Sequence, residues 1–466
     1  MSETTDKKAV VDINTPLIKL ALPVFIQALL SMLIGSADTL MLSQYSDIAV
    51  GAVGNANQVL GFLTLAFTII SSATGVVVSQ YLGAKENNKI SKIYTVSIAF
   101  NLLLSATISL IVFAGSKSLL TLIQVPEGLI PDAVSYIKIV GGYIFLQALI
   151  EVFNQILRSN GKVLFGMIVA LAMNIFNIGG NWLVLYGPLS GYFSGYGENG
   201  PPAIWGALGP LFGYVTGATG VAISSVVSRL VGLTALIIYF HFKIEGSISI
   251  KHLNPFPKDI LLGLIRLGIP TAGENISYNI SQVVITSFVN TLGLMTINTK
   301  TYCTNLTNFS YLYSISVAMA TQIIVGHAVG AGKYDFAYKR VYKSILPSEI
   351  VSVGIAVVNY LISPITLSIF TDNPACIALG QDIMLIAVFL EIGRTCNLVI
   401  INSMRAAGDV KFPTYLGIGS MWGISVLGTY ILVMVLPLDL GLRGVWIAMA
   451  ADEILRGIVV LIRWKR

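Results

Sequence analysis

The sequence predicts an all-α polytopic membrane protein with 12 transmembrane helices in two six-helix lobes. Three observations support this prediction: the composition, a series of long apolar segments and an internal repeat. The 466-residue chain is 55% hydrophobic and only 11% charged, whereas about 25% of an ordinary soluble domain is charged. The mean hydropathy is +0.81. This composition excludes a disordered, collagen-like or disulfide-rich chain and disfavours a soluble multidomain enzyme.

Long apolar segments follow one another along the whole chain. An apolar helix crosses a bilayer with about 20 residues. Lipid cannot hydrogen-bond to a free backbone, so segments of this length are expected to be helices. The predicted spans are 16–43, 52–81, 91–123, 133–157, 164–186, 217–241, 260–292, 299–326, 343–370, 379–404, 413–436 and 444–463.

The cationic side chains indicate the orientation of these spans. Of the 28 Lys and Arg residues, 21 lie in the N-terminal segment or around the loops that follow the even-numbered spans. Only four lie on the opposite side, and three lie within spans. Because Lys and Arg are enriched in cytoplasmic loops, both termini are expected in the cytoplasm. The net charge of +6 therefore reports topology, and no nucleic-acid partner is needed to explain it.

The two halves of the chain match at an offset of 247 residues. Pro23 corresponds to Pro270, Gly83-Ala84 to Gly330-Ala331, and the Arg158 segment to the Arg405 segment. Six helices return the chain to its starting side, so the halves are expected to be parallel copies, as in many transporters, with the substrate path between them. The predicted parts are an N-lobe at 1–242, a cytoplasmic linker at 243–258 and a C-lobe at 259–466. Near 217 the offset falls to 224, which indicates an extracellular insertion at about 187–216.

Polar side chains form a stripe on the first span. Gln27, Ser31, Gly35 and Asp38 follow one another at steps of four, four and three residues, which is one helical face. An isolated carboxylate in a span costs at least about 2.5 kcal/mol on insertion scales, so Asp38 is expected to face water or a partner. The alternative is that Asp38 lies near the outer end of the helix and is simply hydrated.

Asparagines form a similar stripe on the fifth span, at Asn174, Asn177 and Asn181. With Asp38 they could form an oxygen-rich site for a small cation or hold a shared proton. Alternatively, they form hydrogen bonds between helices, as Asn commonly does in membranes.

In the second half, Glu274 occupies the repeat position of Gln27, and Tyr278, Ser281 and Gln282 follow on nearby turns. Glu274 has no oppositely charged neighbour on its own helix. We therefore predict that Gln27, Ser31, Glu274, Tyr278 and Gln282 bind substrate.

The tenth and twelfth spans contain acidic and basic residues at helical spacing. Glu391 and Arg394 are three residues apart, and Asp452 and Glu453 precede Arg456 by four and three residues. Such intrahelical pairs cancel charge. Glu391–Arg394 and Glu453–Arg456 are therefore predicted to be structural ion pairs, although on the twelfth span Asp452 can pair with Arg456 as well as Glu453 can.

The sequence contains no GxxxxGK[ST] phosphate loop, nucleophile elbow or metal-ligand spacing. We therefore expect no enzymatic activity and no resident cofactor, and energy for transport would come from an ion gradient.

Seven segments together resemble the multidrug and toxic compound extrusion (MATE) family over essentially the whole chain. In the first half they are LALPVFIQALLSMLIGSADTLMLS, GVVVSQYLGAKENN and LRSNGK. In the second half they are LGIPTAGENISYN, TQIIVGHAVGAGKYDFA, EIGRTCNLVIINSMRAAGDVKFP and GLRGVWIAMAADEILRG. The last two are similar to a bacterial subgroup of the family.

This resemblance implies a V-shaped central cavity and export of organic, often cationic and aromatic, compounds in exchange for Na+ or H+. Asp38 matches the family's first-helix aspartate, a coupling-ion residue. Asn177 and Asn181 match a pattern in which a carboxylate follows the Asn by four residues. Asn181 replaces that carboxylate here, which disfavours proton sharing between two aspartates. Arg394 stands where some members have an aspartate, which disfavours a sodium site of that type in the second lobe.

The resemblance also sets expectations for partners and location. We expect a monomer in the inner (plasma) membrane of a bacterial cell that binds small organic substrates and no nucleic acid. Na+ or H+ is expected as the coupling ion, with no metal other than Na+ at Asp38. The alternative is a flippase or exporter of an endogenous lipid-linked saccharide or metabolite. Flippases of this kind usually have fourteen helices and a more basic cavity, so the count of twelve favours an antiporter.

Overall fold

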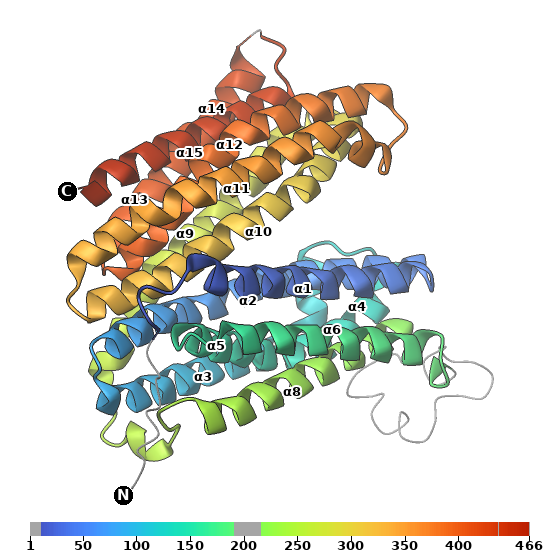
Figure 1. Ribbon diagram of the computed structural model, residues 1–466. Coiled ribbons are helices and arrows are strands. Elements are labelled where there is room, and N and C mark those ends of the chain that lie inside the picture. The colour runs from blue at the N-terminus through green and yellow to red at the C-terminus, as the bar shows by residue number, and fades with distance from the viewer. Residues whose placement is uncertain (1–10, 191–215, 437, 466) are drawn as a thin grey trace, which may run out of the picture. The chain divides into compact units, whose positions relative to one another are not determined.

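The computed structural model describes residues 11–190, 216–436 and 438–465, which form helices joined by short connections, without a β-strand in these ranges (Figure 1). Contacts divide the chain into two compact units. The first contains Ile26–Val78 and Asn87–Ile265, and the second contains Arg266–Arg466 together with Val10–Phe25 and Ser79–Glu86. The bounds of the two predicted lobes stay a prediction.

The first half of the chain forms the first six predicted spans, one of which is broken into two helices. The helices are α1 (Leu17–Ser43), α2 (Asp47–Gly83), α3 (Asn87–Leu122), α4 (Ile130–Gly142), α5 (Phe145–Ser159), α6 (Val163–Leu185) and α8 (Gly217–Lys243), with short 3-10 helices η1 (Glu127–Leu129) and η3 (Ile250–Leu253). Residues 191–215, most of the predicted insertion, lie outside the described residues.

The second half forms the remaining six spans. They comprise α9 (Lys258–Asn290), α10 (Leu294–Gly330), α11 (Tyr334–Ser368), α12 (Pro374–Ala406), the run α13 (Lys411–Ser420), η4 (Met421–Val426), α14 (Leu427–Tyr430) and η5 (Ile431–Val435), and α15 (Leu442–Lys465). Both η4 and η5 are π-helical. Such segments are rare and often lie at functional sites.

Within the described residues, nine helices are long and apolar enough to cross a membrane, or ten if the bent pair α4–α5 is one span. The two other predicted spans, α9 and α15, do not meet this criterion. Both contain ionisable side chains in mid-helix, including Glu274 in α9 and Asp452 and Arg456 in α15. Buried charges are not confined to these two helices, because Asp38 on α1 and Glu391 on α12 are buried as well.

The internal repeat is visible in the helix bounds. α2 and α10 begin at residues 47 and 294 and end at 83 and 330, so both ends differ by 247 residues. α5 and α12 likewise end at 159 and 406. The break in the first copy is a difference between the halves: α4 and α5 meet at a 40° bend, whereas α12 is continuous. α4 ends on Gly141 and Gly142, and glycine is poorly suited to a helix interior.

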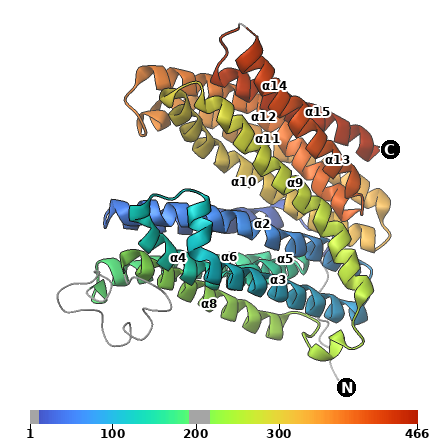
Figure 2. The same ribbon diagram turned by 180° about the vertical axis from the view of Figure 1, so that it is seen from behind.

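Each unit has its own packing centre. In the first unit, α4 and α5 pack against α3 and α8, and α6 packs against α8 (Figure 2). In the second unit, α12 packs against α10, α11 and α15. Side chains on different faces of α12 therefore contact three different helices.

Candidate functional site

Asp38 lies at the centre of a polar cluster formed by α1, α6 and α8 of the first unit. It is buried, and each carboxylate oxygen accepts a hydrogen bond. The amide of Asn181 on α6 donates to Oδ1 at 2.6 Å, and the hydroxyl of Ser225 on α8 donates to Oδ2 at 3.1 Å. Asn177 in turn donates to Ser225 Oγ at 3.0 Å. The cluster thus consists of a carboxylate held by two adjoining helices.

Two amide oxygens of this cluster have unused hydrogen-bonding capacity. Oδ1 of Asn177 and Oδ1 of Asn181 are buried and have no hydrogen-bond partner among the described residues. A buried polar atom without a partner is costly, so it commonly marks a place where an ion, water or ligand binds. A carboxylate with neutral amide oxygens is a donor set suited to a hard cation. The residues therefore fit a small coupling ion.

Asn174 and Arg229 lie next to the Asp38 cluster and do not hydrogen-bond to its carboxylate in the described residues. Asn174, one turn before Asn177, donates to the backbone oxygens of Leu30 and Ala170 at 2.9 and 2.8 Å. Its amide therefore ties α6 to α1. Arg229, one turn beyond Ser225 on α8, interacts electrostatically with Asp38. This cation provides a counter-charge for the carboxylate.

Two equivalent polar pairs join helices at matching positions of the repeat. In the first unit, Arg158 Nη2 donates to Gln27 Oε1 at 2.8 Å. In the second unit, Arg405 Nη2 donates to Glu274 Oε2 at 2.6 Å. The partners are 131 residues apart in both cases. In the first pair, an arginine contacts the neutral amide of Gln27. In the second pair, an arginine contacts the carboxylate of Glu274, so this pair is an ion pair.

Glu274 is not an unpaired carboxylate. Glu274 has no charged partner on its own helix, but Arg405 at the end of α12 forms a buried salt bridge with it. The exposed fractions of the two side chains are only 14% for Arg405 and 10% for Glu274. The pair gives Glu274 a structural role in joining α9 to α12, and its predicted contact with substrate stays a prediction.

The remaining predicted substrate residues lie in more open positions. Ser31 is exposed, and its hydroxyl donates to the backbone oxygen of Gln27 at 2.9 Å. Tyr278 is 42% exposed and interacts electrostatically with Arg394. Gln282 is half-buried, and its backbone oxygen accepts from Thr286. Ser31 and Gln27 are thus adjacent, whereas Gln282 lies two turns away from Glu274 along α9.

The predicted Glu391–Arg394 pair is present in the structure. Arg394 Nη1 lies 2.5 Å from Glu391 Oε1. The other carboxylate oxygen accepts from Ser352 at 3.2 Å, and Ser352 shares a buried hydroxyl cluster with Ser314 and Thr395. This carboxylate is therefore held by α11 as well as by its own helix.

On α15, the two acidic residues Asp452 and Glu453 have different partners, and the arginine pairs with Asp452. Asp452, rather than Glu453, contacts Arg456 directly, through the i,i+4 geometry of a helical ion pair. Glu453 instead turns toward α12, where Asn397 Nδ2 donates to its Oε2 at 2.8 Å. The direct partner of Glu453 is thus neutral, although Arg456 and Arg394 still act on it electrostatically.

One carboxylate, Glu349 on α11, was missed. It is half-buried, and its Oε2 is a buried atom without a hydrogen-bond partner in the described ranges. The signal was available, because Glu349 is an isolated acid inside the predicted span 343–370. Among the described residues, no group of three or more His, Cys, Asp or Glu side chains could hold a metal ion.

The comparisons with known proteins agree with this architecture. The MatE family model matches residues 23–183 and 270–431. A relative described as the uncharacterized transporter YisQ of Bacillus subtilis is 37% identical, over 99% of this chain and 96% of its own length. A probable multidrug resistance protein NorM of Thermotoga maritima is 26% identical, over 99% of this chain and 95% of its own length.

Solved structures show the same fold. A MOP superfamily transporter from Pyrococcus furiosus superposes with a TM-score of 0.84 at 19% identity, covering 98% of this chain and 96% of that one. A MATE structure in a bent conformation gives the same TM-score and covers 95% of that chain. The predicted all-α, two-lobe fold with 12 helices is thereby confirmed. The chain is a multi-pass membrane protein and belongs to the MatE family of transporters.

Proposed function

We propose that this protein exports organic compounds, cationic or aromatic in character, in exchange for Na+ or H+ by alternating access. The observation that supports this proposal is the Asp38 cluster. Asp38 is a buried carboxylate with a nearby cation and two unpartnered amide oxygens. Such a site can bind a small cation or accept a proton in one state and release it in another.

Relatives support the substrate class. Several of them, including the protein from Thermotoga maritima and one from Pectobacterium atrosepticum, are described as multidrug resistance proteins. In the second unit, the carboxylate of Glu453 on α15 accepts from a neutral amide and forms no salt bridge with a described Lys or Arg. Negative charge favours organic cations over anions.

The proposed setting follows from the distribution of Lys and Arg. The protein acts in the bacterial plasma membrane with both termini in the cytoplasm. It acts as a monomer on small organic molecules, and the coupling ion is the only inorganic ligand required. No cofactor takes part.

The test is ethidium efflux from proteoliposomes under separately imposed gradients. A Na+ gradient at constant pH, and a pH gradient without Na+, should identify the coupling ion, because only one should drive efflux by the wild type. Asp38→Asn should abolish this efflux while the protein still inserts and folds. The matched control is Asp382→Asn, because the side chain of Asp382 is 47% exposed and forms a surface pair with Arg443 at 2.7 Å.

Two results would contradict the proposal. Ethidium movement no faster than in protein-free vesicles under either gradient would reject export of this cation class. Full gradient-driven efflux by Asp38→Asn would show that coupling occurs elsewhere.

A further inference from the structure

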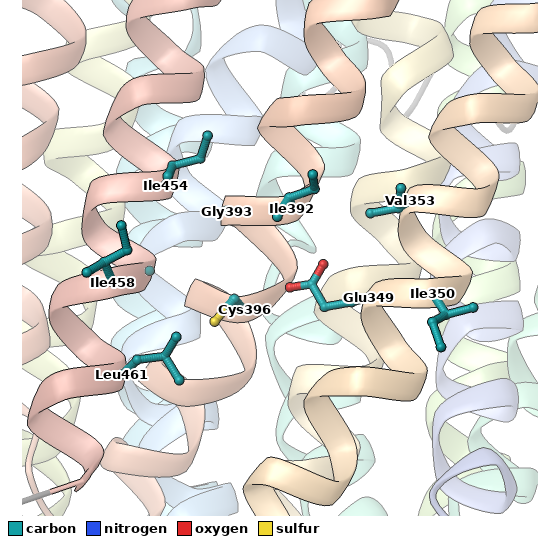
Figure 3. A pocket seen from close by; sticks show the side chains of 10 residues that line it. Glu349, Ile350, Val353, Ile392, Gly393, Cys396, Ile454, Ile458 and Leu461 are labelled. Carbon is teal, nitrogen blue, oxygen red and sulfur yellow. The ribbon is translucent and has the colours of Figure 1, made fainter.

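A cavity of about 420 Å³ lies between α11, α12 and α15 of the second unit (Figure 3). Its volume falls within the range of about 300–1,000 Å³ that is typical of small-molecule sites. None of the residues predicted to bind substrate or the coupling ion lines it. The cavity is therefore separate from the sites described above.

The floor of the cavity is backbone because α12 and α15 cross closely at two glycines. A Cβ added to Gly393 would lie 2.4 Å from the backbone nitrogen of Ile454, and one added to Gly457 would lie 3.3 Å from the backbone oxygen of Gly393. Neither position can hold a larger side chain without moving a helix. The hollow is therefore built into the crossing of the two helices.

The walls are apolar with one exception. Of the ten lining residues, Glu349 is the only one with a charged side chain, and the others include six isoleucine, leucine or valine residues. Figure 3 shows the Glu349 carboxylate pointing from α11 toward α12, between Gly393 and Cys396, with Ile454 and Ile458 of α15 beyond them. The negative group thus points into an apolar chamber.

The carboxylate of Glu349 is not neutralised within the described part of the protein. No Lys or Arg there forms a salt bridge with it, and its Oε2 has no hydrogen-bond partner. Glu391 also interacts electrostatically with Glu349, although its own charge is paired with Arg394. A carboxylate in apolar surroundings attracts a cation more strongly than it does in water. A cationic ligand would therefore supply a counter-charge that the described residues do not.

The cavity opens on an apolar surface of the second unit. Ile350 and Ile392 on its rim are 66% and 45% exposed, and both lie on helices that are apolar enough to span a membrane. Lys343, the preceding cation on α11, is six residues before Glu349, or about 9 Å along the helix. A ligand dissolved in the bilayer can therefore reach Glu349 without passing through water.

We propose that this cavity binds lipophilic organic cations that enter from the bilayer. The aliphatic walls hold the apolar body of the ligand, and Glu349 neutralises its charge. The role of the site rests on the proposed export function, for which it collects substrate from the membrane. Binding itself does not depend on export, so the two proposals can fail separately.

Cys396 lines the cavity and can report its occupancy. The chain has three cysteines, so Cys303→Ser with Cys376→Ser leaves a single thiol. This variant is placed in nanodiscs of phosphatidylglycerol, a lipid with no cationic headgroup, and alkylated with an uncharged, bilayer-soluble maleimide. Tetraphenylphosphonium is the probe, and tetraphenylborate is its control of the same shape and opposite charge.

Tetraphenylphosphonium at ten times its dissociation constant should slow alkylation about tenfold, since only the unoccupied fraction reacts. Tetraphenylborate should protect much less. Glu349→Gln should remove the difference between the two ions, whereas Glu127→Gln, at an exposed carboxylate of η1, should preserve it. These results would establish a charge-selective site at Glu349.

Three outcomes would overturn the proposal: equal protection by the two ions, full protection by tetraphenylphosphonium in Glu349→Gln, or a Cys396 that the maleimide does not reach. None of these bears on gradient-driven ethidium efflux by the wild type. Conversely, charge-selective protection without any efflux would leave the binding site intact and reject the proposed function.

Discussion

Arg405 forms an ion pair with Glu274 at 2.6 Å, and this contact lies at the repeat position where Arg158 contacts Gln27 at 2.8 Å. Both guanidinium groups come from the end of a helix that precedes a glycine turn, and both partners lie four residues after the proline of α1 or α9. The same contact between two helices therefore occurs twice in one chain, once with a neutral glutamine and once with a charged glutamate.

The contact between Arg158 and Gln27 predicts how the pair of Arg405 and Glu274 tolerates substitution. Glu274→Gln recreates the contact seen at Gln27, because a glutamine oxygen still accepts from Arg405. Glu274→Ala leaves the buried guanidinium without a partner and should cost about 3–5 kcal/mol of unfolding free energy. We expect Glu274→Gln to cost less than half as much. Thermal unfolding of both variants in detergent measures the difference.

A substrate-binding role for Glu274 gives the opposite pattern. Both variants would then melt like the wild type, and both would lose apparent affinity for ethidium. This result would contradict the structural assignment.

Asn181 and Asn174 lie on one helix but should have different roles. Asn181→Ala removes the 2.6 Å hydrogen bond to Asp38 and a free amide oxygen, and should lower the apparent affinity for the coupling ion about tenfold. Asn174→Ala removes hydrogen bonds to the backbone oxygens of Leu30 on α1 and Ala170 on α6, at 2.9 and 2.8 Å, and none to Asp38. It should lower the melting temperature and leave ion affinity unchanged. The ion-concentration dependence of efflux, with melting curves, distinguishes the two variants.

Hydropathy predicted the apolar segments well and the helix ends poorly. The predicted spans begin at 299 and 343, whereas α10 begins at Leu294 and α11 at Tyr334. The first turns of α11 contain Asp335, Lys339 and Arg340. A helix continues through polar residues because its hydrogen bonds are internal, whereas hydropathy reports only the part of the chain suited to lipid.

Periodicity predicted the stripe around Asp38 but could not supply partners from other helices. Ser225 is one of many serines in the sequence, and only the packing of α8 brings it to Asp38. Arg405 could have been inferred from Arg158 through the repeat if either pair had been known. An isolated acid inside a span marks Glu349 as unusual, but its cavity could not be predicted because it depends on the packing of α12 and α15.

The neighbouring acids on α15 should differ in their effect on stability. Asp452→Ala leaves the buried guanidinium of Arg456 without its direct partner and should cost about 3–5 kcal/mol. Glu453→Gln keeps an oxygen that accepts from Asn397 and should cost roughly 1 kcal/mol or less. Detergent unfolding curves of the two variants test this order. Equal losses would show that Glu453 stabilises Arg456 as much as Asp452 does.

Because α12 and α15 cross closely, a single methyl group added at the crossing should lower the free energy of unfolding. Gly393→Ala places its Cβ 2.4 Å from backbone of Ile454, so the helices must separate, at a cost of about 1–3 kcal/mol. Gly419→Ala is the matched control, since nothing lies within 4 Å of its added Cβ. The control should melt at the wild-type temperature or slightly higher, because alanine favours a helix. Equal melting temperatures for the two variants would contradict the crossing geometry.

The pair Glu391–Arg394 allows a test by double mutation. Arg394→Ala leaves a buried carboxylate without its cation and should cost about 3–5 kcal/mol. Adding Glu391→Gln removes that charge and should recover part of the loss. Recovery should be incomplete, because the 5.6 Å contact between Arg394 and the Tyr311 ring is also lost. The two single variants and the double variant, unfolded in detergent, give the coupling energy directly. If Arg394 instead contacts substrate, Arg394→Ala would keep its melting temperature and lose transport, and the second substitution would recover nothing.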